Sequence, residues 1–186
     1  MADQTRYAAD PDRLALVLPG GGYTPARPLL HLTRLVLLSL GWTVREVWWR
    51  PPAWPNPEER TAWVAEQASA ALAEETASRV LLVGKSLGSP AAGLAAERAL
   101  PAVWLTPLLV EPAVVDRLRA ATAPTLLVGG AADALWHADR ARELGHALLE
   151  VPEADHALEV PADPVRSARI LVEVTDRLNR FVAALD

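Results

Sequence analysis

The most informative stretch of the chain is residues 80–88, Val-Leu-Leu-Val-Gly-Lys-Ser-Leu-Gly. An apolar run of strand length leads into Gly84-Lys85-Ser86-Leu87-Gly88, which matches G-x-S-x-G, and an alanine-rich segment follows. A sharp turn from strand to helix strains the serine backbone and needs small residues two positions to either side, which Gly84 and Gly88 supply. The pattern therefore predicts that the Ser86 hydroxyl projects above a sheet at the start of a helix. There the helix dipole and the N–H of Leu87 favour a developing negative charge.

The ending Gly84-Lys85-Ser86 is also how a phosphate-binding P-loop ends. A P-loop needs another glycine five residues before Gly84, with a flexible loop between the two glycines. Arg79 occupies that position, and the residues between are an apolar run. The P-loop is therefore disfavoured, and the other alternative is a tight turn that carries no chemistry.

Strand-length apolar runs alternate with segments of helical period along the chain. The runs are residues 14–18, 43–49, 80–83, 102–105, 125–128 and 147–151. The helical segments are residues 28–40, 58–75, 88–100, 112–121, 138–144 and 164–185. This alternation predicts a single α/β domain over residues 1–186, a three-layer sandwich whose mainly parallel sheet has about six strands.

Composition and charge exclude several classes of protein. The chain has 186 residues, of which 51% are hydrophobic and 22% charged, a profile that fits a folded domain and excludes a disordered chain. A net charge of −5 without a basic run argues against nucleic acid as a partner. Because cysteine is absent, disulfides, thiolate metal sites and cysteine nucleophiles are excluded.

The terminal and apolar segments bear on location. Residues 1–12 carry three aspartates and no apolar core, so we expect a flexible segment and no secretory signal. The richest apolar stretch, residues 29–40, is too short to span a bilayer. We therefore expect a cytoplasmic protein with no membrane partner. Every basic residue except Lys85 is arginine, which indicates a GC-rich, bacterial genome.

Two further residues could activate the Ser86 hydroxyl. A serine hydroxyl is a poor nucleophile until a base takes its proton, and an acid must orient that base. In the chain order serine, acid, histidine that goes with G-x-S-x-G, the candidates are Asp133 and His156. Each lies just past the carboxyl end of a predicted strand, so we expect both to share one rim of the sheet with Ser86.

Other acids and histidines have plainer interpretations. Asp139 is the alternative acid, whereas Asp155, beside His156, is expected to be a solvated loop residue or to form a turn. His31 lies in an apolar helix, where a packing or surface role is expected. His137 and His146 flank a short predicted helix, and His137 is close enough to Asp133 in sequence to line the rim and contact substrate.

With these residues placed, the chain resembles the α/β-hydrolase superfamily, as a small, cap-less, esterase-like serine hydrolase. The motifs VLLVGKSLG, LLVGGAAD and VPEADHALEV carry the resemblance, which extends from Leu14 to Leu185. It implies that Ser86 is the nucleophile, Asp133 the acid and His156 the base. It also implies a core of six parallel strands that lacks the first two antiparallel strands of the full fold, with no metal or organic cofactor.

Acyl transfer also needs hydrogen-bond donors for the oxyanion. One is the N–H of Leu87, and the second is expected from the loop Pro-Gly-Gly-Gly-Tyr at residues 19–23, similar to the HGGG-type loop of esterases. Either Gly21 or Gly22 could supply it. Alternatively, the three glycines merely allow a tight turn, and a dinucleotide site fits worse because the G-x-G-x-x-G spacing is missing.

Aromatic residues are candidates for the substrate pocket. Trp48 and Trp49 end the second predicted strand, Trp136 follows Asp133, and Tyr23 closes the glycine loop. Their alternative role is core packing. If two or more line the cleft, an apolar or aromatic group on the substrate is favoured. Lys85 is expected to be structural or to support the site indirectly.

The sequence thus favours a serine hydrolase that cleaves a carboxylic ester of a small-molecule substrate through an acyl-enzyme. Thioesters, amides and lactones use the same machinery. The alternatives are a non-catalytic binding or scaffold protein on a hydrolase fold, and an acyltransferase with the same triad. A homodimer is compatible with the sequence.

Overall fold

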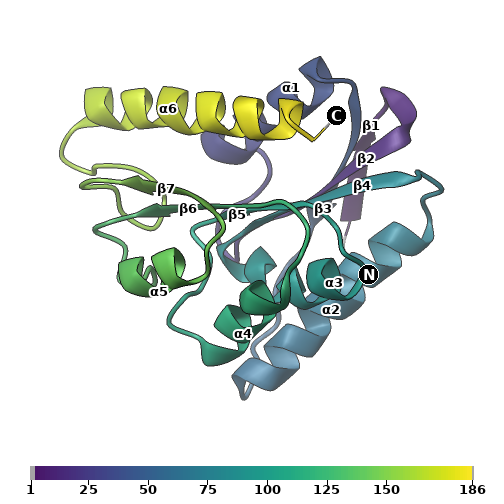
Figure 1. Ribbon diagram of the computed structural model, residues 1–186, viewed down its shortest axis with the longest axis horizontal. Coiled ribbons are helices and arrows are strands. Elements are labelled where there is room, and N and C mark those ends of the chain that lie inside the picture. The colour runs from purple at the N-terminus through teal and green to yellow at the C-terminus, as the bar shows by residue number, and fades with distance from the viewer. Residues whose placement is uncertain (1–2, 186) are drawn as a thin grey trace.

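The computed structural model describes residues 3–185 and contains one seven-stranded sheet between two layers of helices (Figure 1). The strand order is β1-β3-β2-β4-β5-β6-β7, and every neighbouring pair is parallel except β1 and β3. The strands are β1 (Asp3–Tyr7), β2 (Asp10–Leu18), β3 (Trp42–Trp48), β4 (Arg79–Lys85), β5 (Ala102–Leu105), β6 (Thr125–Gly130) and β7 (Ala147–Val151). The predicted three-layer α/β sandwich is confirmed.

Helices α1 (Pro28–Ser39) and α6 (Pro164–Ala183) cover one face of the sheet (Figure 1). The other face carries α2 (Pro57–Ala73), α3 (Ala92–Glu97), α4 (Pro112–Ala120) and α5 (Ala138–Glu143). Four of these helices, α1, α2, α4 and α6, begin with proline, whose fixed φ suits the first helical turn. The side chains of Asn56 and Asp163 cap α2 and α6 by accepting hydrogen bonds from main-chain N–H groups.

One predicted helix differs from the structure. Instead of a single helix over 88–100, a 3₁₀ helix, η1 (Ser86–Ala91), comes first and α3 follows it. Pro90 lies inside η1 and cannot donate a main-chain hydrogen bond, which accounts for the irregular start.

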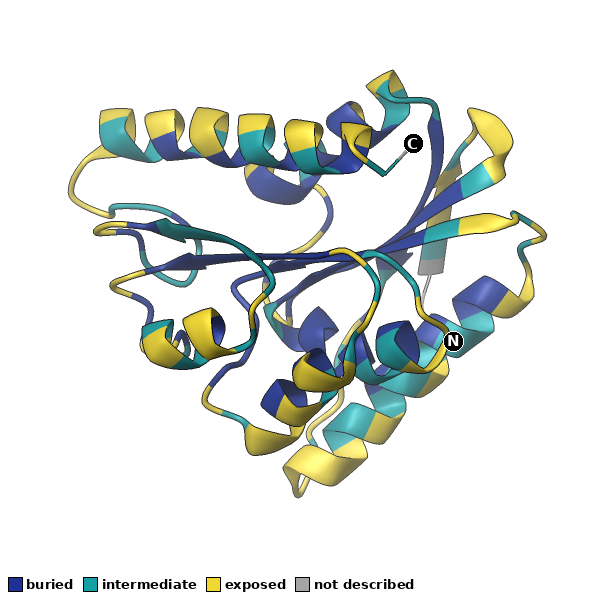
Figure 2. Ribbon diagram, in the orientation of Figure 1, coloured by how far each residue is buried: buried dark blue, intermediate teal, exposed yellow. Residues whose placement is uncertain are grey.

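The central strands are buried on both faces, as Figure 2 shows in dark blue. Leu14, Leu16 and Leu18 of β2 pack toward α2–α5, and Ala15 and Val17 pack toward α1 and α6. This arrangement explains why these strands read as continuous apolar runs instead of alternating ones. A sheet held on both sides gives its loops at the carboxyl edge a rigid base.

Two expectations for the N-terminus are corrected by the structure. Residues 3–7 form β1, and β2 begins at Asp10, in place of the flexible segment expected over residues 1–12; residues 1 and 2 lie outside the described part. The sheet therefore has seven strands instead of six, and the additional strand, β1, is antiparallel to its neighbour β3. The sequence Asp-Gln-Thr-Arg-Tyr holds no apolar run, so the pattern used to find strands missed it.

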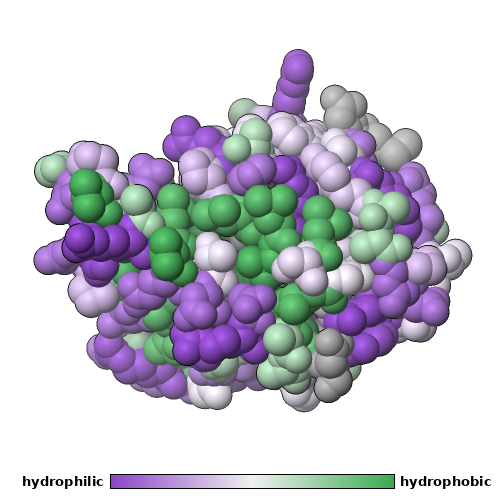
Figure 3. All heavy atoms as spheres, turned by 90° about the horizontal axis from the view of Figure 1, so that it is seen from above, coloured by the Kyte–Doolittle hydropathy of each residue, from purple (hydrophilic) through white to green (hydrophobic). Residues whose placement is uncertain are grey.

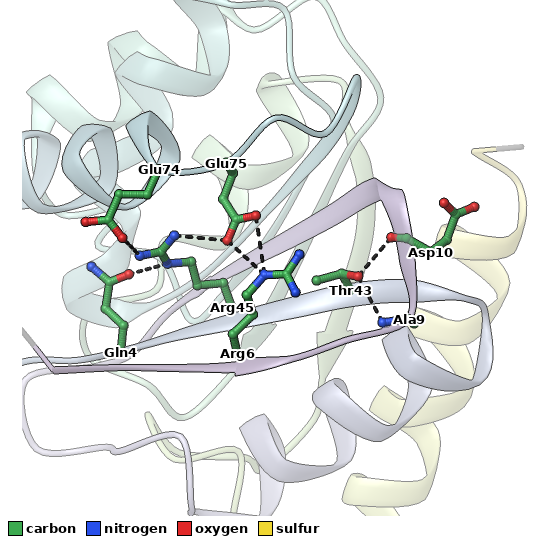
Figure 4. A network of polar contacts seen from close by, with 8 residues as sticks. All are labelled: Gln4, Arg6, Ala9, Asp10, Thr43, Arg45, Glu74 and Glu75. Atoms are coloured by element: carbon green, nitrogen blue, oxygen red, sulfur yellow. Dashed lines mark hydrogen bonds and ion pairs between the residues drawn. The ribbon is translucent and has the colours of Figure 1, made fainter.

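Polar side chains hold this edge strand in place (Figure 4). Arg45 of β3 forms an ion pair with Glu75 at 2.9 Å, and it also pairs with Glu74 and Gln4. Arg6 of β1 reaches the same Glu75 carboxylate at 3.2 Å. The network joins β1 and β3 to the segment that follows α2. The edge strand β1 is therefore held by charged side chains and not by apolar ones.

The outer face of α1 and α6 carries apolar side chains, seen from above in Figure 3. A groove between the two helices is lined by Leu32, Val36, Ala168, Leu171 and Val172. The homodimer compatible with the sequence stays a prediction. Among residues 3–185, no helix combines the length and the apolarity that a membrane crossing requires.

Candidate active site

The turn between β4 and η1 places Ser86 at the carboxyl edge of the sheet. Ser86 has a φ of 49°, a left-handed conformation that non-glycine residues seldom adopt. A Cβ at Gly84 would lie 2.4 Å from the Trp104 ring, and one at Gly88 would lie 2.6 Å from the Leu18 carbonyl oxygen. Both glycines are therefore needed for the close approach of neighbouring strands to the turn, and the strained serine is held by its surroundings.

Ser86, His156 and Asp133 form a continuous chain of hydrogen bonds. The distance from His156 Nε2 to Ser86 Oγ is 2.7 Å, and that from His156 Nδ1 to Asp133 Oδ2 is also 2.7 Å. The Asp133 side chain is 1% exposed and that of His156 is 34% exposed. A buried carboxylate that accepts from Nδ1–H leaves Nε2 free to take the serine proton.

The loops after β6 and β7 support each other and thereby bring Asp133 and His156 together. The N–H of Ala132 donates to the Ala154 carbonyl at 3.0 Å. A Cβ at Gly130 would lie only 2.1 Å from that same carbonyl oxygen. The main chains of the two loops are thus in direct contact, and a side chain at Gly130 would separate them.

The two alternative acids have other partners. The Asp155 carboxylate accepts from the N–H groups of Ala157 and Glu159 at 2.8 and 3.0 Å, so it shapes the loop that carries His156. Asp139 is exposed and pairs with Arg142 at 2.9 Å. Neither is bonded to the imidazole of His156.

The glycine loop after β2 lies beside Ser86. A Cβ at Gly20 would lie 3.6 Å from Ser86 Cβ, and one at Gly21 would lie 3.7 Å from Leu87 Cδ2. The N–H of Gly20 donates to the Tyr23 carbonyl at 3.1 Å, whereas the N–H groups of Gly21 and Gly22 have no partner among the described residues. Both candidate donors are therefore available, and the choice between them stays a prediction.

The predicted aromatic residues differ in how the protein uses them. Trp49 is buried, donates to the Gly20 carbonyl at 3.4 Å and packs on Trp63, so it supports the glycine loop. Trp136 is buried over Gly129, and its indole N–H donates to Glu150 at 2.8 Å. Both indole N–H groups are hydrogen-bonded within the protein, and the contact of these rings with substrate stays a prediction.

The three remaining residues predicted to contact substrate lie in different parts of the structure. The Tyr23 ring is buried, and its hydroxyl accepts from the N–H of Leu29 at 3.1 Å; burial raises the pKa of this phenol. Trp48 is half-buried at the end of β3, opposite Asp3 of β1. His137 is exposed at the N-terminus of α5.

The other two histidines are held away from the triad. His31 Nδ1 lies 2.7 Å from Arg34 Nη2, and His146 Nε2 lies 2.8 Å from the Leu118 carbonyl. Both have partners that account for their rings without a catalytic role.

Sequence reasoning missed two polar side chains that support the site. Ser89, fully buried, donates to the Ser86 carbonyl at 2.6 Å and accepts from the N–H of Leu108 at 3.2 Å. Thr106, also fully buried, accepts from Lys85 Nζ at 2.8 Å. Ser89 lies three residues after Ser86, a spacing that could have identified it, but nothing in the sequence marks Thr106.

Lys85 is 1% exposed, and burial lowers the pKa of its ammonium to about 8 from the usual 10.5, against the opposing effect of the Asp133 and Asp155 carboxylates. Between pH 8 and 10.5 the unfolded chain binds a proton that the folded chain has lost. The free energy of unfolding should therefore rise with pH across this interval and fall again as pH drops toward 8.

We expect the stability of the wild type relative to Lys85→Met to increase by roughly 3 kcal/mol between pH 7.5 and pH 10.5. The methionine variant cancels the titration of all other groups, and Lys85 is the chain's only lysine. Urea unfolding of both proteins at the two pH values measures the difference. An identical difference at both values would contradict the expectation.

No family model and no curated protein matches the sequence. Solved structures match in fold. An alpha-beta serine hydrolase homologue from Coxiella burnetii gives a TM-score of 0.72 at 14% identity, covering 95% of this chain and 88% of that one. A serine hydrolase without lid from Xanthomonas campestris gives a TM-score of 0.66 at 18% identity, and the match covers 98% of this chain and 88% of that one. An esterase from Pyrococcus furiosus gives 0.68 at 14% identity, covering 99% and 92%.

The TM-scores of 0.66 to 0.72 indicate that these structures share the overall fold of this chain. At such low identity the likeness concerns the fold and not the chemistry. The chain therefore has the α/β-hydrolase fold, to which its described residues add no cap domain.

Proposed function

We propose that the protein is a serine hydrolase that cleaves a carboxylic ester, or a related acyl bond, through an acyl-enzyme on Ser86. One observation carries the proposal: the unbroken chain of 2.7 Å hydrogen bonds from Asp133 through His156 to Ser86 Oγ. A binding protein needs no such activation of a hydroxyl group. The α/β-hydrolase fold of structures that include a serine hydrolase and an esterase supports the proposal.

The first half-reaction acylates Ser86. His156 Nε2 takes the Ser86 proton while Oγ attacks the carbonyl carbon, and the buried Asp133 carboxylate stabilises the imidazolium that forms. The N–H groups of Leu87 and of Gly21 or Gly22 hold the oxyanion. When the tetrahedral intermediate collapses, the C–O bond to the alcohol breaks and His156 returns the proton to the leaving oxygen.

The second half-reaction releases the acid. Water gives a proton to His156 Nε2 and attacks the acyl carbon, and the resulting intermediate expels Ser86 Oγ, which recovers its proton. The imidazole is one-third exposed, which gives water a route to the acyl-enzyme and favours hydrolysis. The same exposure favours small or sterically open ester groups.

Steady-state hydrolysis of p-nitrophenyl esters from acetate to octanoate tests this function. We expect saturable turnover by the wild type and highest activity on short chains. His146→Ala serves as the matched histidine control, because the His146 ring is hydrogen-bonded to the Leu118 carbonyl of α4 and not to Ser86 or Asp133. The absence of turnover above the buffer rate for the whole series, with folded protein, would overturn the proposal.

A further inference from the structure

The Lys85 side chain joins three segments that are distant in sequence. It leaves the end of β4, next to Ser86, and its Nζ donates to Thr106 Oγ1 at 2.8 Å and to the main-chain carbonyl of His156 at 2.9 Å. Thr106 follows β5, and His156 lies in the loop after β7. One ammonium group thus ties the residue before the serine to the main chain of the histidine.

Thr106 is held in a strained conformation that aims its hydroxyl at Lys85. Its φ is 46°, an outlier for a β-branched residue, and its N–H donates to the Val128 carbonyl at 2.6 Å. Such a conformation persists only where the surroundings over-determine it, and it clusters at functional sites. Strain and burial together make this hydroxyl a fixed acceptor for the ammonium.

An aromatic ring and several charged groups surround the Lys85 ammonium. Tyr23 from the glycine loop lies with its ring centre 4.9 Å from Nζ, and Asp133 and Asp155 attract the charge from the loops after β6 and β7. The positive charge of Arg27, before α1, opposes that of Lys85, and its guanidinium lies 5.1 Å from the centre of the same Tyr23 ring. Burying this charge is costly, so an apolar side chain would serve better if Lys85 only filled space.

We propose that Lys85, oriented by Thr106, is a positioning residue that fixes the His156 main chain so that Nε2 stays within hydrogen-bond reach of Ser86 Oγ. This inference rests on the proposed serine hydrolase function. Lys85 is bonded to no triad side chain, so it acts through the loop and not as an acid or base. A displacement of about 1 Å at a catalytic group costs about 100-fold in rate, so loss of this contact should be visible in turnover.

Three variants separate positioning from mere packing. Lys85→Met keeps the length of the side chain and removes the donor. Thr106→Val keeps the shape and removes the acceptor, and Thr106→Ser keeps the hydroxyl. Thr125→Val is the matched control. Thr125 is a buried threonine at the start of β6, at the amino ends of the strands, and its hydroxyl donates to the Ala123 carbonyl.

We expect Lys85→Met to lower kcat for a p-nitrophenyl ester about 100-fold and Thr106→Val about tenfold, with KM within about threefold of the wild type. Thr106→Ser and Thr125→Val should stay within about threefold in both constants. The rate of fluorophosphonate labelling should fall in parallel with kcat. If Lys85→Met fails to fold, the comparison of Thr106→Val with Thr106→Ser still tests whether the Thr106 hydroxyl is needed for positioning.

Two outcomes would overturn the inference. One is a kcat close to the wild-type value in the folded variants that lack the donor or the acceptor. The other is an equal loss in Thr106→Ser and Thr106→Val, which would assign the effect to packing. A wild type that neither hydrolyses esters nor reacts with fluorophosphonate would instead overturn the proposed function, so the two failures are distinguishable.

Discussion

Alanine in place of Ser86 should lower kcat for ester hydrolysis by about 10⁶-fold, and His156→Ala should cost about as much. The reason is that the two side chains act as one unit: without the imidazole the hydroxyl keeps its proton, and without the hydroxyl the imidazole has nothing to activate. The double variant should therefore be no slower than either single variant. Initial rates with the best p-nitrophenyl ester, at matched protein concentration, measure all three.

The Asp133→Asn variant extends this test to the orienting acid. An asparagine keeps the shape but places an amide beside His156 Nδ1, which favours the wrong tautomer and should cost about 10⁴-fold. Circular dichroism checks that each variant is folded, and His146→Ala should retain wild-type rates. If Ser86→Ala kept more than a hundredth of the activity, the hydrolysis would originate elsewhere in the protein.

The largest effect on stability is expected for Gly130→Ala. Its new Cβ would lie 2.1 Å from the Ala154 carbonyl oxygen and 2.9 Å from that of Asp155, both main-chain atoms that cannot rotate away. We expect a loss of roughly 3–5 kcal/mol in the free energy of unfolding. Because the displaced segment carries His156, the folded fraction should also lose activity.

Urea unfolding measures this change, with Gly22→Ala as the control for stability alone. A Cβ at Gly22 would meet nothing within 4 Å, so that variant should differ from the wild type by less than about 1 kcal/mol. An unfolding midpoint for Gly130→Ala equal to that of the wild type would show that the two loops are not in contact as described.

Local pattern predicted most of the fold. β5 and β7 match the predicted runs, and the four other predicted strands differ only at their ends. The central strands are recognisable because they are buried on both faces, and the half-buried edge strand β7 still begins with three apolar residues. β1 escaped prediction because its partners are Glu75, Arg45 and the edge of β3, and none of these is recognisable from four polar residues and a tyrosine.

The sequence predicted some residues of the candidate site and not others. Ser86, Asp133 and His156 could be placed on one rim from chain order alone, since parallel strands bring their carboxyl ends to the same edge. The bridge from Lys85 to Thr106 and His156 could not, because it depends on how three loops from different parts of the chain lie relative to one another. Trp136 was equally ambiguous, because an indole near the acid can face solvent or the core.

Whether Ser86 is an activated nucleophile can be tested by the intact mass of the purified protein after treatment with a fluorophosphonate. We expect a single adduct on the wild type, which peptide mapping places on Ser86, and no adduct on Ser86→Ala or His156→Ala. No adduct on folded wild-type protein, or an adduct that persists in Ser86→Ala, would contradict this expectation.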